Sequence, residues 1–285
     1  MNYGILNEYV FINNINEKKY KETNILVQEL LKTLYPWIKE NDMVVAYKYG
    51  RYAKTDIVVS VRNIKKGISI KSGDKNSVHL ERIDNFCKFL YKHKIREINN
   101  LKKYLYSDGT NNNTGKIRCS AEEYKKKHPE DIIKINIELN KIKKQLIERF
   151  LFKSDVNYKV NVDVIVHGSI NDFIWATKDE IIEHLMIKEI ESSGVNVSSL
   201  NIQNWDKNLK KNPKYEYCRN YIQVKWFNLF DDIIQIMCKR NEVKLQTDCV
   251  KQKKNSVITK FLKYIWSGWW ESDPRSQLGR LRFYH

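Results

Sequence analysis

The sequence predicts an α/β fold in which a mixed β-sheet is flanked by helices. Two apolar, β-branched runs at residues 55–61 and 67–71 are typical of buried strands, and the short turn between them favours a hairpin. Before them, apolar residues recur at helical spacing in residues 23–38, where Thr23 is a suitable cap and Pro36 is expected to kink the last turn. A helical pattern next to strand patterns indicates an α/β core.

The remaining elements follow the same reasoning along the chain. Residues 43–49 are expected to form a further strand, and Ser77 is expected to cap a helix over residues 77–90. A long helix is predicted at residues 131–151, then strands at 160–167 and 173–175, and a helix capped by Thr177. Residues 221–226 are expected to be a strand that leads into a helix through Ile236.

The predicted hairpin places chemically useful side chains together. Pairing of its strands would bring Asp56 and Lys71 towards the same end of the sheet. A carboxylate there can hold a divalent cation, while an ammonium steers a water or stabilises charge on a phosphate. These are the parts that a metal-dependent phosphodiesterase needs.

The order of these residues resembles the PD-(D/E)xK nuclease superfamily, which includes many restriction endonucleases. The resemblance covers roughly residues 23–90, about a quarter of the chain, and implies a restriction-endonuclease-like core with an elaborated C-terminal half. The sequence departs from the family at Thr55, where Pro is usual, and at Ser69, where the family has a second acid. Some members place that acid on the helix after the lysine strand, where this chain carries Glu81 and Asp84.

The resemblance implies a Mg²⁺-dependent endonuclease acting on double-stranded DNA, of a type II-like restriction or defence kind. Asp56, helped by Glu81 or by Glu29 of the first helix, would hold the metal. Lys71 would position the attacking water, and Ser69 would add a hydrogen bond or a water-mediated metal contact. A homodimer is expected if the enzyme cuts both strands at a palindromic site.

Charge and composition support a nucleic-acid partner. The 285-residue chain carries 51 Lys and Arg against 34 Asp and Glu, a formal charge of +17, and its 42% hydrophobic content is typical of a folded protein. Aromatic and basic residues interleave over residues 205–226, as is typical of surfaces that bind phosphates and bases. The residues expected to contact nucleic acid are Lys48, Lys75, His79, Lys211, Lys214, Arg219, Lys225, Arg280 and Arg282.

Three other interpretations stay open from the sequence. Ser69 favours an inactive nuclease fold that binds DNA, and the aromatic and basic stretch favours an RNA-binding or RNA-processing protein. A rival catalytic motif could use the Gln-x-Lys of Gln223 and Lys225, with Asp163 or Asp172 as its acid.

The chain is expected to form a nuclease-like domain over residues 1–240, followed by a basic, Trp- and Arg-rich extension over 241–285. Within the domain, the core motif occupies 23–90, a basic insertion about 92–127, and the second half of the sheet about 155–240. Five scattered cysteines without a C-x-x-C pair argue against a zinc ribbon or a disulfide framework. No signal-peptide pattern and no apolar run of about 18 residues is found, so a cytoplasmic protein without a membrane segment is expected.

Overall fold

The computed structural model describes residues 3–50, 53–73, 76–108, 110–115, 121–153, 159–189, 194–204 and 213–251. The chain divides into two compact units, Met1–Cys238 and Lys239–His285. The first unit contains two sheets and every site residue that the structure describes, whereas the second is described only at the end of helix α9 (Leu229–Lys251). None of the helices in the described ranges is long and apolar enough to cross a membrane.

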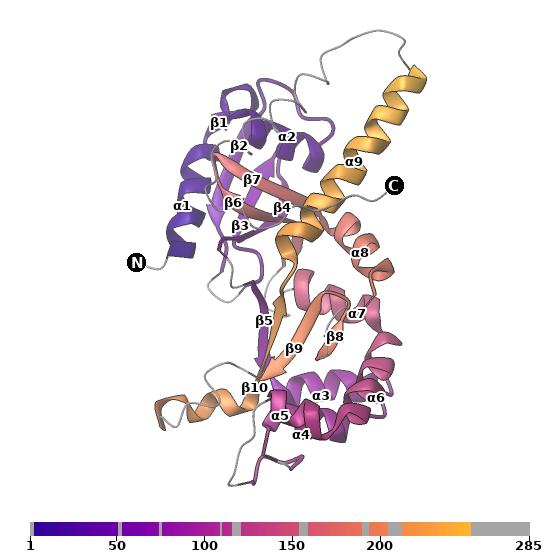
Figure 1. Ribbon diagram of the computed structural model, residues 1–285. Coiled ribbons are helices and arrows are strands. Elements are labelled where there is room, and N and C mark those ends of the chain that lie inside the picture. Colours follow the sequence, from indigo (N-terminus) through magenta and orange to yellow (C-terminus); the bar gives the residue numbers. More distant parts are fainter. Residues whose placement is uncertain are drawn as a thin grey trace, which may run out of the picture. The chain divides into compact units, whose positions relative to one another are not determined.

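The first sheet is mixed, as the sequence predicts (Figure 1). Its strand order is β1-β2-β3-β4-β6-β7, and all neighbours are antiparallel except β4 and β6. The strands are β1 (Lys18–Lys19), β2 (Met43–Lys48), β3 (Ile57–Val61), β4 (Ile64–Lys71), β6 (Val162–Ser169) and β7 (Asp172–Thr177).

The predicted hairpin is formed by β3 and β4, with a tighter turn than expected. Arg62 and Asn63 alone make the turn, and both have positive φ, 48° and 66°. A two-residue turn of this kind matches the twist of the flanking strands, and asparagine tolerates the left-handed conformation well. The resulting register pairs Ile57 with Ile68, so Asp56 comes to lie beside the end of β4.

The parallel pairing of β4 with β6 depends on Gly67. A Cβ at this position would lie 2.1 Å from the carbonyl oxygen of Asn161, so the two backbones can approach only at a glycine. The register shifts between Gly67 and Ile68, and the Asp163 carboxylate accepts hydrogen bonds from the Gly67 amide (2.8 Å) and from Lys66 Nζ (3.1 Å). Asp163 therefore helps to hold β4 against β6 at Lys66 and Gly67.

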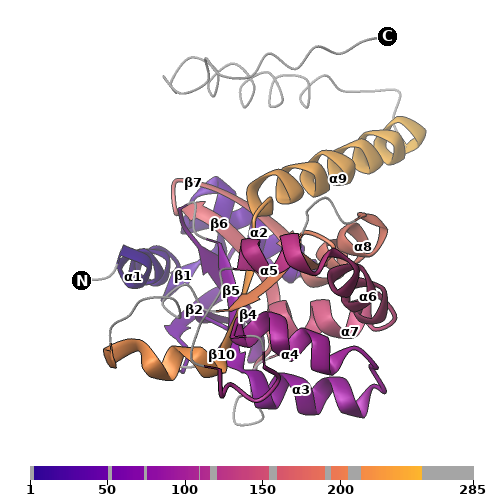
Figure 2. The same cartoon turned by 60° about the horizontal axis from the view of Figure 1, so that its bottom comes forward.

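Helices cover both faces of the first sheet, and in Figure 2 α1 and α8 lie on opposite sides of it. α1 (Tyr3–Ile15) and α2 (Ile25–Leu34) pack on one face, while α8 (Lys178–Ile187) packs on the other. α2 begins after Asn24, whose side chain caps the Val27 amide (2.8 Å), one residue later than the predicted cap. It ends at Leu34, so the expected kink at Pro36 is wrong, whereas the Thr177 cap is confirmed.

The second sheet contains a segment, residues 77–82, that the sequence predicts to be the start of a helix. Residues 77–82 form a strand rather than a helix, because β10 supplies an antiparallel partner that pairs Ile222 with Glu81; the helix starts only at Ile83. The order is β5-β10-β9-β8. The strands are β5 (Ser77–Arg82), β10 (Tyr221–Trp226), β9 (Leu200–Asn204) and β8 (Val195–Val197).

Helices pack against one face of this sheet and form the larger hydrophobic core with it. The predicted long helix over 131–151 is wrong, because it breaks near Asn140, whose side chain bonds the Asn136 carbonyl (2.9 Å). The expected basic insertion is largely helical and contributes Leu101, Tyr104 and Tyr124 to the core. The elements are α3 (Ile83–Lys92), α4 (Ile98–Tyr106), α5 (Ala121–Lys127), α6 (Pro129–Asn140), α7 (Lys143–Ile147) and a π-helical turn, η2 (Glu148–Phe152).

Candidate active site

Asp56 lies at the end of the β3–β4 hairpin, where the chain enters β3. Its amide donates to the Ile68 carbonyl (2.9 Å), which places the carboxylate over the end of β4. There Oδ2 accepts hydrogen bonds from Ser69 Oγ (2.9 Å) and from the Ile70 amide (2.6 Å), and Lys71 Nζ lies 3.5 Å away. Among the described residues none donates to Oδ1. The structure thus brings together the predicted Asp56, Ser69 and Lys71.

This group is accessible as well as ordered. The Asp56 and Lys71 side chains are 20% and 22% exposed, so an external phosphate can reach them, while Ser69 is buried behind them. The Thr55 hydroxyl donates to the Val160 carbonyl (3.0 Å), which anchors the strand just before Asp56. Threonine at position 55, where proline was expected from the resemblance, therefore provides a hydrogen bond that anchors this segment.

Lys54 is a neighbour of this group that the sequence reasoning missed. Its Nζ lies 2.6 Å from His79 Nδ1 and donates to the Phe150 carbonyl (2.9 Å). Burial, and then the positive charge of Lys71, lower the pKa of Lys54 to about 7. The signal available in the sequence was its position, because Lys54 lies only two residues before Asp56.

Glu81 belongs to a buried cluster rather than to a helix flank. Arg149 holds its carboxylate with two hydrogen bonds, Nε to Oε1 at 3.1 Å and an Nη2 contact to Oε2 at 2.5 Å. His79 Nε2 lies 3.1 Å from Oε1 without being aligned for a hydrogen bond, and the Arg149 guanidinium lies over the Phe89 ring at 4.5 Å. Burial favours the protonated acid, but the positive charge and the two hydrogen bonds of Arg149 outweigh it and lower the pKa of Glu81. The carboxylate is therefore ionised and already paired.

His79 is buried as a neutral ring between Lys54 and Glu81. Burial, and then the charge of Lys54, lower the pKa of His79 to about 4. Its ring also lies 5.2 Å from that of Phe150. The prediction that His79 contacts a phosphate is therefore wrong, because its ring is buried inside the protein.

The other predicted residues are dispersed. Glu29 lies partly exposed on α2. The pKa of Tyr20 is raised mainly by the burial of its own side chain, and the negative charge of Glu29 raises it further. Within the described ranges no three His, Cys, Asp or Glu side chains are arranged to hold a metal ion, so Asp56, Glu81 and Glu29 do not form one cluster. Lys48 forms an ion pair with Glu8 of α1 (2.8 Å).

The remaining basic residues fall in two groups. Arg219 is half-buried where a 3₁₀ helix ends, and Lys225 is half-buried on β10. Lys75, Lys211, Arg280 and Arg282 lie outside the described residues, as does the side chain of Lys214.

The rival motif is not assembled. Asp163 and Asp172 lie on β6 and β7 of the first sheet, while Gln223 and Lys225 lie on β10 of the second. The Asp163 carboxylate also accepts hydrogen bonds from Lys66 and from the Gly67 amide. We therefore place the candidate site at Asp56 and Lys71.

The donor set at Asp56 fits a magnesium ion. Mg²⁺ is commonly held by one or two carboxylates, with waters and substrate phosphates supplying its other oxygen ligands. Asp56 Oδ1 is an oxygen donor of the required type, while the Ser69 hydroxyl is hydrogen-bonded to Oδ2. A second protein carboxylate is not needed for such binding.

The fold matches that of a DNA-bound enzyme. The chain is similar to the solved structure of the restriction endonuclease MspI in complex with its cognate DNA, with a TM-score of 0.54 and 12% sequence identity. The alignment covers 78% of this chain and 88% of that one. Comparisons with protein-family models and with curated proteins find no match. The protein therefore has a restriction-endonuclease-like fold, which confirms the fold class predicted from the sequence.

Proposed function

We propose that this protein is a Mg²⁺-dependent endonuclease that hydrolyses double-stranded DNA, as a type II-like restriction or defence enzyme. The observation that carries the proposal is the grouping of Asp56, Ser69 and Lys71 at one sheet end of a restriction-endonuclease-like fold. The similar MspI structure contains cognate DNA, and the +17 charge of this chain suits the same kind of partner. We also propose a cytoplasmic location and, if the enzyme cuts both strands at a palindromic site, a homodimer.

Each residue has a distinct part in the proposed chemistry. Asp56 would hold Mg²⁺, which when bound would offset charge on the scissile phosphate and acidify a bound water. Lys71 would orient the attacking water and stabilise negative charge that develops on the phosphate. The Ser69 hydroxyl and the Ile70 amide hold the Asp56 carboxylate through Oδ2, so Oδ1 would be the oxygen that binds the metal.

An inactive DNA-binding protein is the second candidate function. It is favoured by Ser69 in the acid position and by the pairing of Glu81 with Arg149, which leaves Asp56 as the available carboxylate of the sequence-predicted set near Lys71. An RNA-binding protein is a third, drawn from the aromatic and basic stretch at 205–226, most of which lies outside the described residues.

Cleavage assays test the proposal. Plasmid and genomic DNA are incubated with wild type, Lys71→Ala or Lys65→Ala, in Mg²⁺ or in EDTA. Lys65 is an exposed lysine of the same strand and serves as the matched control. We expect discrete Mg²⁺-dependent fragments with wild type and Lys65→Ala that disappear with Lys71→Ala.

The other outcomes separate the candidates. Cutting that survives Lys71→Ala overturns this site, and Lys225 is then examined first. Absence of cutting together with tight, salt-sensitive duplex binding supports the inactive protein. Binding of single-stranded RNA that duplex DNA does not displace supports the RNA-binding candidate.

A further inference from the structure

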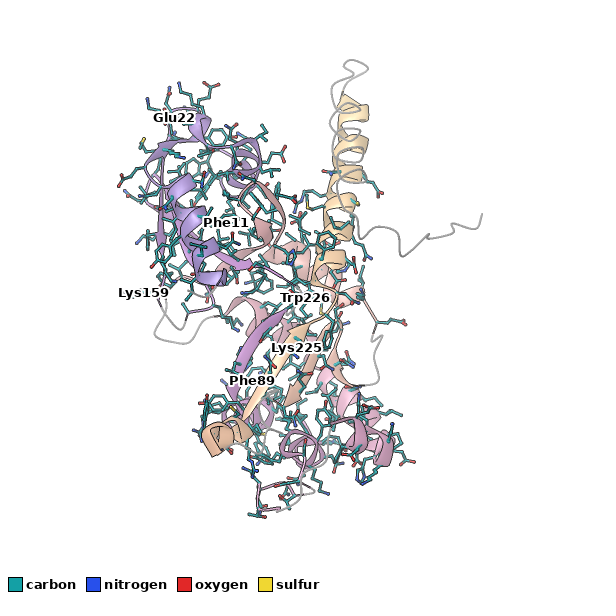
Figure 3. All side chains as sticks on the ribbon, turned by 60° about the vertical axis from the view of Figure 1, so that its left-hand side comes forward. Phe11, Glu22, Phe89, Lys159, Lys225 and Trp226 are labelled. Atoms are coloured by element: carbon teal, nitrogen blue, oxygen red, sulfur yellow. The ribbon has the colours of Figure 1, made fainter. Side chains whose placement is uncertain are left out.

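The two faces of the second sheet differ in chemistry. Along β10, Ile222, Val224 and Trp226 point into the large hydrophobic core. Because side chains alternate along a strand, Tyr221, Gln223 and Lys225 belong to the opposite face. Figure 3 labels Trp226 and Lys225, neighbours in sequence that belong to these two faces.

A row of polar side chains crosses three strands on this second face. Gln203 of β9 lies opposite Gln223 in the register, and its Nε2 donates to Gln223 Oε1 (3.5 Å). Gln223 Nε2 in turn donates to Ser77 Oγ of β5 (3.0 Å). Gln223 is 9% exposed, whereas Gln203 is half-buried and Ser77 is exposed, so the central amide orients the two outer groups. We call Ser77, Gln203, Tyr221, Gln223 and Lys225 the amide face.

A short segment of chain connects the amide face to the candidate active site. Lys71 ends β4 and Ser77 begins β5, with only residues 72–76 between them. The Trp226 amide donates to the Asn76 carbonyl (2.9 Å), which ties the end of β10 to this connection. Lys225 is paired with Ser77 in the sheet, so it belongs to the strand end next to the connection from Lys71.

We propose that the amide face reads base edges of double-stranded DNA, with Gln203 and Lys225 in contact with bases and Gln223 positioning Gln203. This inference rests on the proposed function, because it takes duplex DNA as the substrate. Glutamine amides match the edge of adenine in the major groove, and lysine matches that of guanine. Strands are known to enter DNA grooves, and the amide face carries two amides and a cation without a carboxylate. Its link to the Lys71 strand would couple recognition to the site of cleavage.

The test is selection from a randomised duplex library. Selection is done in a Lys71→Ala background, so that bound duplexes stay intact, and affinity is then measured for the selected duplex and a scrambled one. We expect Gln203→Ala to reduce the preference for the selected duplex by about tenfold or more, the usual value of a bidentate base contact. The affinity for the scrambled duplex should change by less than about threefold, because phosphate contacts supply it. Gln145→Ala, on an exposed glutamine of α7, should leave both affinities unchanged.

A second variant guards against a folding defect. Gln203→Glu keeps the shape of the side chain but can only accept hydrogen bonds, so selection should yield a different base, cytosine in place of adenine, at one position. Gln223→Ala should weaken the same base preference as Gln203→Ala, as expected of a positioning residue.

The outcomes distinguish failure of this inference from failure of the proposed function. A wild type that binds no duplex DNA overturns the proposed function itself. A wild type that binds duplexes without sequence preference, or variants at Gln203 that keep the wild-type preference, overturn the amide face alone. Variants of the amide face that change only the binding of single-stranded RNA would also contradict the inference that this face reads duplex DNA.

Discussion

Two carboxylates near the β4–β5 connection are treated in opposite ways by the structure. Glu81 is 10% exposed and its two oxygens face Arg149, with His79 beside one of them. Asp56 is twice as exposed, and its contacts with Ser69, Ile70 and Lys71 converge on Oδ2. A carboxylate with both oxygens paired stabilises the fold, whereas one fixed through a single oxygen can hold a ligand. From this contrast we propose a structural role for Glu81 and a chemical role for Asp56.

The largest effect is expected at Asp56. Asp56→Asn should reduce DNA cleavage at least about a thousandfold, because a metal ligand supplies several kcal/mol of charge stabilisation. Its thermal unfolding should stay close to that of wild type. The measurement is the rate of plasmid cleavage in Mg²⁺.

Asp163→Asn is the matched control, since Asp163 also contacts a β4 amide and a β4 lysine but uses both oxygens. It should lower stability while leaving cleavage within about threefold of wild type, an effect of less than 1 kcal/mol on the barrier. Equal loss of cleavage in both variants would remove the distinction between the two aspartates.

Glu81 should show the reverse pattern. Glu81→Gln leaves Arg149 without its partner, and we expect the free energy of unfolding to fall by about 3 kcal/mol, the low end for a broken buried pair. We use the low end of this range because the Arg149 side chain is 29% exposed, so water can partly solvate its charge when the partner is lost. Urea unfolding measures it, with Glu122→Gln as the control, because Glu122 pairs with Lys126 on the surface of α5.

This variant also tests the role that the sequence suggested for Glu81. Cleavage at a temperature where Glu81→Gln stays folded should be retained. A stable variant without cleavage would make Glu81 a metal ligand, as the resemblance to the nuclease superfamily implied.

The sequence predicts the β3–β4 hairpin well and the second sheet poorly. The run from Ile57 to Lys71 is read from local pattern, because β-branched residues, a tight turn and one register suffice to place Asp56 beside Lys71. Ser77–Arg82 instead becomes a strand only because β10, far along the chain, pairs with it. Such a long-range partner leaves no local signal, since the apolar spacing of the segment also suits a helix.

The site shows the same limit. Asp56, Ser69 and Lys71 come from one hairpin and could be found together, while the cluster of Lys54, His79, Glu81 and Arg149 joins β5 to a π-helical turn. No spacing in the sequence links Arg149 to Glu81. The pairing of Glu81 with Arg149 could therefore be seen only in the fold.

An intermediate effect is expected from His79 as the pH changes. Its pKa is lowered from 6.5 to about 4, so the unfolded chain takes up a proton at a higher pH than the folded protein. The contribution of neutral His79 is therefore present above pH 6.5 and is lost as the pH falls towards 4, by about 3 kcal/mol. Lys54, Glu81 and Arg149 face the ring and are retained in the His79→Gln variant.

Urea unfolding between pH 7 and pH 4 measures this dependence. The His79→Gln protein should lose less stability over that interval than wild type. Identical slopes for the two proteins would show that the ring is accessible to protons in the folded state, which would weaken its place in the buried cluster.

The smallest effect is expected at Ser69, and it tests how Asp56 is held. Ser69→Ala removes one hydrogen bond to Oδ2 but leaves that of the Ile70 amide, so the carboxylate keeps its position. We expect cleavage to fall about fivefold, corresponding to about 1 kcal/mol for a single hydrogen bond. Because Ser69 is buried, its methyl replacement should be tolerated by the fold. A loss of cleavage as large as that of Asp56→Asn would instead mean that the hydroxyl itself contacts the metal or the attacking water. The difference between a carboxylate held through one oxygen, Asp56, and one paired through both, Glu81, would then not explain the site by itself.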